Sequence, residues 1–417
     1  MCPHPHGRNR YRCHRVNRWP DHIVRQRAEH DMLTGMAFVA QKRLFRWVFA
    51  LAAALVWSAT AAAGPFSGLV VFGDSLSDIG NVSQATPIFP FVPKTPGPYY
   101  WNGRFSNGPV YAESLATGLG LPDLARSTTA GGGDFAYGGA KTSGTSFPTS
   151  IVVRDVDDQV GDFLAGPAAD PNALFVVFAG ANDLIDGQTN MSVPVNSLAT
   201  SIGRLIADGA RQFLVFNLPL LGYTPRYNGN QTTRDQYNTR SQQYNTALAT
   251  MLGGLHTSNP AVTVYQFDVA AMFNQALATP QAFGLTNVTN SAAPGLQPGA
   301  TSYNTSLIVS NPNQYMFWDD LHPTAAVHAI LAQRALDLFR LPGDFNHDQV
   351  VDAADYIAWR NGVGTTYIPN DYDIWRSHFG APTGSGAASQ TSVPEPFNIT
   401  LLVVAFSVLS FRQKESN

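Results

Sequence analysis

The sequence predicts an α/β protein with a central, mostly parallel sheet between two layers of helices. Four short apolar runs have the length and the β-branched content of buried strands: 68–72, 174–178, 213–217 and 262–267. Amphipathic, helix-like runs alternate with them at 109–119, 195–209 and 324–339, and a long polar helix is expected within 225–252. This alternation is typical of a parallel sheet covered on both faces. A functional site is then expected at the carboxyl ends of the strands.

The first strand leads directly to a serine. Gly73 ends the apolar run, and Ser75 follows where the strand turns toward a helix. A hydroxyl at this edge of the sheet can attack an ester carbonyl if a base and an oxyanion hole are nearby. Taken alone, such a serine is more often a helix N-cap.

A second segment, 316–323, supplies a carboxylate and an imidazole three positions apart. Asp319 and His322 can touch on one tight turn, and Pro323 allows a helix to begin after the histidine. The carboxylate would orient the imidazole and stabilise its charged form. An ordinary capping contact is the alternative. Asp320 is the rival carboxylate, but the three-residue spacing favours Asp319.

Two further loops carry hydrogen-bond donors. Residues 134–140 contain two adjacent glycines, and the apolar run 174–178 leads into Gly180 and Asn182. Glycine amides and asparagine side chains are good oxyanion donors, although they also occur in ordinary turns and caps. Four such elements in one order, each after a strand-like run, favour a catalytic site.

That order resembles the GDSL, or SGNH, hydrolase family of esterases and lipases over about residues 66–341. Gly73-Asp74-Ser75-Leu76 is the motif that names the family, and the similarity continues to Asn81. Further similar segments are 135–140, 180–183 and 319–323, and 217–222 resembles the lipase-like branch. The resemblance implies a flavodoxin-like sheet.

The resemblance also implies a role for each matching residue. Ser75 would be the nucleophile, His322 the base and Asp319 the group that orients it. The oxyanion hole would combine the Ser75 amide with Gly139 and Asn182. Such an enzyme works through an acyl-enzyme and needs no cofactor for catalysis.

Two points about the second similar segment stay open. Gly138 is a less favoured alternative to Gly139, and the sequence does not separate the two. Asp134 stands where the family often has asparagine, which puts the packing of this segment in doubt more than its chemistry.

Composition bounds the class of partner. The 417 residues carry a formal charge of −3, and only 13% of them are charged. No basic face for nucleic acid is implied. The abundance of Gly, Pro, Ser, Thr and Asn suits long surface loops and a secreted protein. One polar stretch, 283–313, is expected to be an extended loop, either near the substrate mouth or simply on the surface.

The N-terminal residues predict export. Basic residues after Met36, an apolar run over 47–57 and the alanines at 61–63 form a signal peptide at 36–63. Residues 1–35 are then expected to be a gene-start artefact. Cleavage near Ala63 would remove Cys2 and Cys13, so no disulfide framework is expected.

A separate module is expected at 342–381. Oxygen ligands stand at the spacing of a twelve-residue calcium loop: Asp344, Asn346, Asp348, Val350, Asp352 and Asp355. Gln349 replaces the usual glycine, and an aspartate ends the loop. Residues 355–360 are echoed at 371–376, so the module resembles a degenerate dockerin repeat. One structural calcium and a cohesin-like partner are possible readings; a metal-free helix pair or a spacer is the alternative.

The C-terminal residues predict sorting. A flexible linker at 382–392 precedes Val393-Pro394-Glu395-Pro396, a short apolar run and a basic tail. This layout over 393–417 resembles a PEP-CTERM signal, which implies transient anchoring and processing by export and sorting machinery. A simple membrane anchor is the alternative.

We therefore expect an exported serine esterase or lipase that acts on a lipid or an acylated carbohydrate. A polysaccharide acetylesterase is the second reading. A surface-attached binding protein without catalysis is the alternative from another class.

Overall fold

The computed structural model describes residues 65–86, 95–339, 341–346, 348, 350–363 and 371–381. The expected signal peptide, linker and sorting signal lie outside these residues. We treat 65–339 as the main domain and 341–381 as the C-terminal module, and describe each by itself. No helix in the described ranges is long and apolar enough to cross a membrane.

The main domain is built on a four-stranded parallel sheet in the order β1-β2-β3-β4. Its strands are β1 (Leu69–Gly73), β2 (Leu174–Phe178), β3 (Gln212–Phe216) and β4 (Thr263–Phe267). All five residues of β2 are buried. A strand buried on both faces needs helices on both faces, which is why these runs are continuously apolar.

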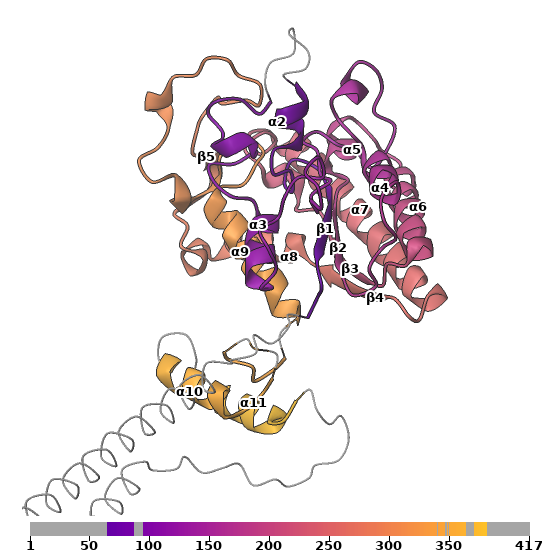
Figure 1. Ribbon diagram of the computed structural model, residues 1–417. Helices are drawn as coiled ribbons and strands as arrows, with labels where there is room; N and C mark the ends of the chain where they lie inside the picture. Colours follow the sequence, from indigo (N-terminus) through magenta and orange to yellow (C-terminus); the bar gives the residue numbers. More distant parts are fainter. Residues whose placement is uncertain are drawn as a thin grey trace, which may run out of the picture. The chain divides into compact units, whose positions relative to one another are not determined.

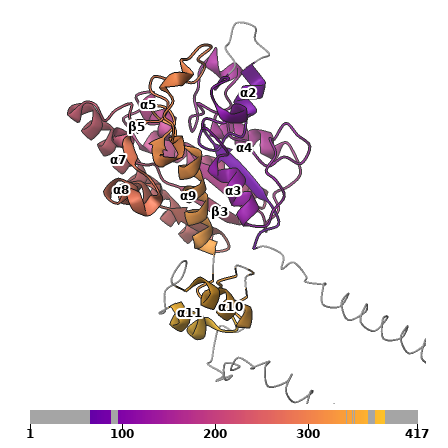
Figure 2. The same ribbon diagram turned by 90° about the vertical axis from the view of Figure 1, so that its left-hand side faces the viewer.

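Helices form the two outer layers: α3 (Tyr111–Gly118), α8 (Val269–Ala278) and α9 (Ala325–Leu336) lie on one face, and α4 (Val156–Leu164), α6 (Ser192–Asp208) and α7 (Gln231–Ser258) on the other (Figure 1). Figure 2 shows α3 and α9 side by side from a second direction. The predicted three-layer α/β/α class is confirmed. The shorter helical elements are α2 (Asn81–Ala85), α5 (Ala181–Ile185), η2 (Trp101–Gly103), η3 (Thr149–Ile151), η4 (Leu221–Tyr223), η5 (Pro280–Phe283), η6 (Thr305–Leu307), η7 (Pro312–Gln314) and η8 (Asp337–Phe339).

The long polar helix begins later than the range 225–252 suggested. The side chain of Asn230 accepts a hydrogen bond from the Thr233 amide at 3.0 Å and caps the first turn of α7. Asparagine is a favoured N-cap because it satisfies an amide that the helix leaves unpaired.

The stretch 283–313 is not simply a loop. It contains β5 (Asn287–Ser291), which pairs in parallel with β6 (Tyr315–Phe317). Beyond β5, the amides of Ala292 and Ala293 donate to the carbonyls of Phe317 and Trp318, each at 2.8 Å. The loop prediction is therefore wrong in part, because polar composition hid a backbone pairing with a segment that follows later in the chain.

An irregular segment, 133–137, runs along the outer edge of β1. The Val71 amide donates to Gly133, and the Phe135 and Tyr137 amides donate to Val71 and Gly73, at 2.8, 2.8 and 3.1 Å. This pairing brings the glycines at 138 and 139 beside the end of β1, where Ser75 lies.

The C-terminal module contains the expected pair of helices, α10 (Ala353–Gly362) and α11 (Asp371–His378). The two helices meet through aromatic rings; Trp359 and Tyr372, for example, have centroids 5.3 Å apart. The indole N–H of Trp375 donates to the Asp352 carbonyl at 2.7 Å. The module thus packs around side chains of both halves of its internal repeat.

Gly180, at the end of β2, provides a test of the fold. Its φ is +110°, and an added Cβ would lie 2.4 Å from the Tyr244 ring. We expect Gly180→Ala to lower the free energy of unfolding by about 2–5 kcal/mol, since strain and overpacking add.

Two matched variants separate these effects in urea unfolding. Gly187 has φ +95° with no atom within 4 Å, so Gly187→Ala should show the backbone strain alone, about 1–2 kcal/mol. Gly203 lies within α6 with free space, so Gly203→Ala should stabilise by about 0.5–1 kcal/mol. Equal stability of all three variants would contradict this account.

Candidate active site

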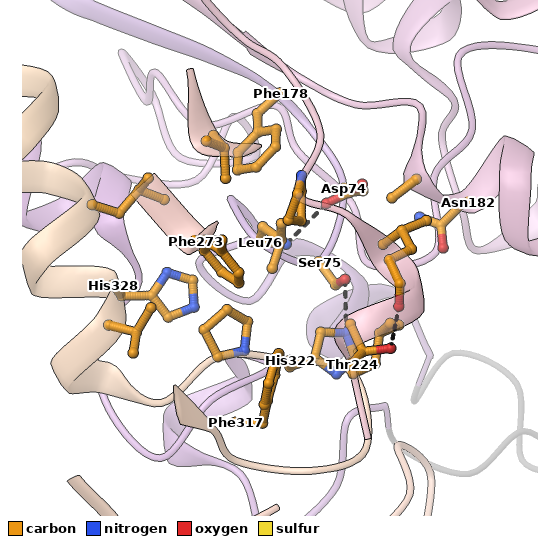
Figure 3. Close-up of a pocket in the computed structure, with 18 of the residues that line it drawn as sticks. Asp74, Ser75, Leu76, Phe178, Asn182, Thr224, Phe273, Phe317, His322 and His328 are labelled. Atoms are coloured by element: carbon orange, nitrogen blue, oxygen red, sulfur yellow. Dashed lines mark hydrogen bonds between the residues drawn. The ribbon is translucent and has the colours of Figure 1, made fainter. Parts of the chain in front are cut away.

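Ser75 meets His322 at the carboxyl end of β1. The Ser75 Oγ lies 2.8 Å from Nε2 of His322 (Figure 3), and both side chains are buried. Gly73 makes the turn possible, because an added Cβ would lie 2.4 Å from the Phe178 carbonyl oxygen of the neighbouring strand. Gln159 holds both polar groups of the Gly73 backbone, at 2.9 and 2.8 Å.

The other ring nitrogen of His322 is held by Asp319. Nδ1 lies 2.7 Å from Oδ2 of this carboxylate, which has no exposed surface. The amides of Leu321 and His322 donate to Oδ1 at 2.8 and 2.7 Å. Since a carboxylate accepts, the proton is on Nδ1, and Nε2 is free to accept the Ser75 hydroxyl proton.

Tyr100 is a further member of this group, and the sequence reasoning missed it. Its hydroxyl donates to Oδ2 of Asp319 at 2.7 Å. Burial and the neighbouring carboxylate raise the pKa of Tyr100, so its hydroxyl keeps its proton. Nothing local in the sequence marks this tyrosine, because its partner lies far along the chain.

The hydrogen bonds to Asp319 also set its charge. Burial alone would raise its pKa, but the charge on His322 and the hydrogen bonds from His322 and Tyr100 hold the pKa below the ordinary value. Asp319 is therefore ionised wherever the site can work.

Asp320, the rival carboxylate, faces elsewhere. It forms a two-point ion pair with Arg226, at 2.7 and 3.1 Å, and accepts a hydrogen bond from Gln297 at 3.0 Å. Of the two adjacent aspartates, the structure places Asp319 against His322.

The candidate oxyanion donors differ in whether their N–H groups are already hydrogen-bonded. The Gly138 amide donates to Asp78 at 2.8 Å and is therefore already used. In the described part of the chain the Gly139 and Ser75 amides have no acceptor, and Gly139 has φ +86°. Asn182 uses one side-chain N–H on the Ala140 carbonyl, at 2.8 Å, and has a second to offer. The geometry favours Gly139 over Gly138.

Residues 69–335 match the family described as GDSL-like Lipase/Acylhydrolase, which covers more than half of the chain. The protein belongs to the GDSL hydrolase family. The chain is 30% identical over 310 residues to a phosphatidylcholine-sterol acyltransferase of Aeromonas hydrophila, covering 65% of this chain and 89% of that one. It is 29% identical over 329 residues to Esterase EstA of Pseudomonas aeruginosa, covering 70% of this chain but only 50% of EstA.

Among solved structures, a family two carbohydrate esterase from Cellvibrio japonicus covers 66% of this chain and 63% of its own. With 16% identity and a TM-score of 0.34, that similarity is too low to bear on fold or function.

In this GDSL hydrolase, Asp78 is a second residue that sequence reasoning passed over. Besides Gly138 it accepts the amides of Gly80 and Asn81 at 2.7 and 2.6 Å. It thereby ties the turn after Ser75 to the glycine segment. Burial raises its pKa to about 6, against the opposing effect of these amides. Its place in the similar segment that continues from the Gly73-Asp74-Ser75-Leu76 motif to Asn81 was the available signal.

Asp134, which stands where the family often has asparagine, is fully buried and hydrogen-bonded. Its Oδ2 accepts the Ile79 amide at 3.0 Å and the Asn81 side chain at 2.9 Å. Burial and the nearby Asp78 raise the pKa of Asp134 well above the ordinary value. The second segment therefore packs closely despite the substitution.

A narrow apolar pocket of this GDSL hydrolase opens at Ser75 and His322 (Figure 3). It runs between the ends of the strands and helices α8 and α9. The residues that line it away from the serine are Phe178, Leu221, Val269, Phe273, Phe317, Val327, His328 and Leu331. Such a lining favours an apolar group over a strongly hydrated one.

The C-terminal loop offers the oxygen donors that calcium prefers, and two of its carboxylates accept backbone amides. Asp355 uses its carboxylate on three backbone amides, those of Phe345, Asn346 and Asp352, at 2.7, 2.9 and 2.7 Å. The Asp348 amide donates to Asp344 at 3.1 Å. Within the described ranges, which leave out His347 and Gln349, no three His, Cys, Asp or Glu side chains gather as metal ligands. Calcium stays a prediction.

Asp74 gives a pH-dependent test of the site. Burial raises its pKa to about 7 from an ordinary 3.8, although the Leu76 amide donates to it at 3.0 Å. Between these pH values the folded protein keeps a proton that the unfolded chain has released. Stability therefore falls as the pH rises from 4 to 7.

The side chain in Asp74→Asn cannot ionise. The unfolding free energy of this variant, relative to wild type, should therefore rise by about 2–4 kcal/mol between pH 4 and pH 7 and should not rise further above pH 7. Urea unfolding at pH 4, 5.5, 7 and 8 measures this. Asp123→Asn, at an exposed aspartate, controls for the loss of one charge. A constant difference between Asp74→Asn and wild type would contradict the expected burial of a protonated carboxyl.

Proposed function

We propose that this protein is an exported serine esterase or lipase that hydrolyses carboxylic esters through an acyl-enzyme. The observation that carries the proposal is the chain of short contacts from Ser75 Oγ through His322 to Asp319. The finding that the protein is a GDSL hydrolase supports ester chemistry. An imidazole oriented in this way is a base for a serine hydroxyl.

In the first step, Ser75 Oγ attacks the ester carbonyl while Nε2 of His322 takes its proton. The imidazolium that forms is stabilised by Asp319, which keeps its negative charge. Tyr100 donates to the same carboxylate oxygen that His322 contacts, which helps to hold Asp319 in place as His322 becomes charged.

The carbonyl oxygen becomes negatively charged in the tetrahedral intermediate. We expect the amides of Ser75 and Gly139 and the second N–H of Asn182 to donate to it. Donors that are already oriented cost no reorganisation at the moment of reaction. His322 then gives its proton to the departing alcohol. Water, activated by the same imidazole, releases the acid and restores Ser75.

The apolar pocket favours an acyl chain longer than acetyl. The apolar lining continues from Ser75 along α8 and α9, and apolar contact is the main source of binding free energy in such a site. The acyltransferase and the esterase among the relatives are consistent with acyl substrates.

The two alternative functions, a polysaccharide acetylesterase and a non-catalytic binding protein, have less support. A polysaccharide acetylesterase would suit the dockerin-like module and a cohesin-like partner, both of which remain predictions from the sequence. A non-catalytic binding protein would leave the contacts between Ser75, His322 and Asp319 without a use. Export, sorting and release or retention at the cell surface rest on residues 36–63 and 393–417, outside the described structure.

Substitutions at the two adjacent aspartates test the enzyme proposal. With p-nitrophenyl acetate and butyrate, Asp319→Asn should lower kcat by about 10⁴-fold, since the wrong imidazole tautomer is then favoured. Asp320→Asn is the matched control and should keep a rate near wild type, because Asp320 pairs with Arg226. Ser75→Ala should abolish the burst of released product.

Asn182→Ala should lower kcat about 10²–10³-fold with little change in KM, because its donor acts on the developing charge. Equal rates for Ser75→Ala and wild type would end the enzyme proposal. Equal losses in the Asp319 and Asp320 variants would overturn the assignment of the carboxylate.

We also propose that the C-terminal module binds one structural calcium through the six oxygen donors named above. Calorimetry of the full chain tests it. At a calcium concentration of about 100 Kd the module should gain about 2.7 kcal/mol, and EGTA should reverse the gain. Asp348→Ala should abolish it. The same melting temperature with calcium and with EGTA would contradict the proposal.

A further inference from the structure

Three polar side chains that the reaction does not use line the apolar pocket beside Ser75: Asp74, Thr224 and His328. Asp74 accepts the Leu76 amide and Thr224 donates to the Leu221 carbonyl. His328, on α9, is 1% exposed and lines this pocket with Phe273 and Leu331 (Figure 3). Its ring is stacked on that of Tyr111, with an interplanar angle of 11°. The imidazole therefore has a fixed orientation within the pocket wall.

One hydrogen bond determines which ring nitrogen of His328 carries the proton. The backbone amide of Tyr111 donates to Nδ1 at 3.2 Å, so Nδ1 must offer its lone pair. Burial, together with the nearby His322, lowers the pKa of His328 to about 3. The ring is neutral, and its only proton is on Nε2.

That Nε2–H is buried and has no hydrogen-bond partner in the described residues. The hydroxyl of Tyr111, on the neighbouring ring, is hydrogen-bonded to Ser77 Oγ at 2.9 Å and not to His328. An unpaired buried donor is unfavourable, and a ligand that brings an acceptor removes that penalty. Apart from Asp74 and Thr224, the other lining residues that the reaction does not use are apolar, so a bound chain would meet the His328 donor among mostly hydrocarbon contacts.

We propose that His328 is a specificity-determining residue that selects acyl chains bearing an oxygen acceptor, such as an oxo group, at a position along the chain. The proposal rests on the esterase function above and names the substrate class of the same site. The acyl part is assigned to the pocket because it stays bonded to Ser75 at the pocket mouth, whereas the alcohol must leave. A site built to hydrogen-bond one substrate group discriminates against the analogue that lacks it.

The test uses the full chain and matched p-nitrophenyl esters. Octanoate is compared with a series of octanoates that carry an oxo group at successive carbons. Wild type should prefer one isomer over octanoate by about tenfold or more in kcat/KM, and should disfavour the others, whose oxygen faces apolar residues. No preference for any isomer would overturn the proposal.

Two variants of His328 test the roles of its two ring nitrogens separately. In His328→Asn the side-chain oxygen can replace Nδ1 as the acceptor for the Tyr111 amide, but the donor that Nε2–H provides in the pocket is lost. In His328→Gln the amide nitrogen can replace Nε2. The ratio of kcat/KM for the preferred oxo ester to that for octanoate should fall to one or below in the Asn variant and stay above one in the Gln variant.

The ratio compares two esters with the same protein. A smaller folded fraction lowers kcat/KM for both esters equally and therefore does not change the ratio. His256→Asn, at an exposed histidine on α7, is the control and should keep the wild-type ratio. A ratio unchanged in His328→Asn, which would mean that a bound water already satisfies Nε2, would overturn the proposal. A preference that appears instead when the oxo group is in the alcohol would overturn the acyl assignment.

Failure of the esterase function is distinguishable from failure of this inference. If wild type hydrolyses octanoate but shows no oxo preference, the inference alone fails. If no ester is hydrolysed, the proposed function fails first.

Discussion

Buried aspartates that accept backbone amides hold the loops around Ser75, and the site depends on them. Asp78 joins the turn after the serine to the Gly138 segment. Asp183 accepts the amide and the hydroxyl of Thr142, at 2.9 and 2.8 Å, and so fixes the loop beside Asn182. Asp319 closes its own turn through two amides. Loops have no ladder of backbone bonds of their own, and these carboxylates supply one.

This way of holding loops has an electrostatic cost. Burial raises the pKa of Asp78, Asp134 and Asp183, because a charged carboxylate loses its hydration. The donated amides oppose that effect. Asp319 differs, since the neighbouring His322 charge is added to its hydrogen bonds and its pKa falls. The carboxylate that must stay charged for catalysis is thus the one with the strongest set of partners.

The same neighbourhood combines two kinds of surface. Polar donors lie at the edge of the sheet where the reacting carbonyl would lie, and the pocket is mostly apolar, with Asp74, Thr224 and His328 as its further polar residues. With the two surfaces separate, the apolar lining would bind the substrate, and the polar donors would act on the negative charge that appears only in the transition state. His328 belongs to the binding wall, because its ring is neutral and held by Tyr111.

The sequence by itself determined the elements that depend on local patterns. The four strands, the helices α3, α6, α7 and α9, the serine after β1 and the Asp–His spacing were readable, because each is set by a few adjacent residues. Their convergence followed from the rule that parallel strands end at one edge. The order of the motifs also identified the family.

Only the tertiary structure decided the choices between similar neighbours. Gly139 is distinguished from Gly138 by Asp78, and Asp319 from Asp320 by Arg226, which lies far along the chain. Tyr100 and the proton position on His328 have no local signal, and the pairing of β5 with β6 was hidden by polar composition. The physical reason is common to all of them: each depends on a contact between segments that only folding brings together.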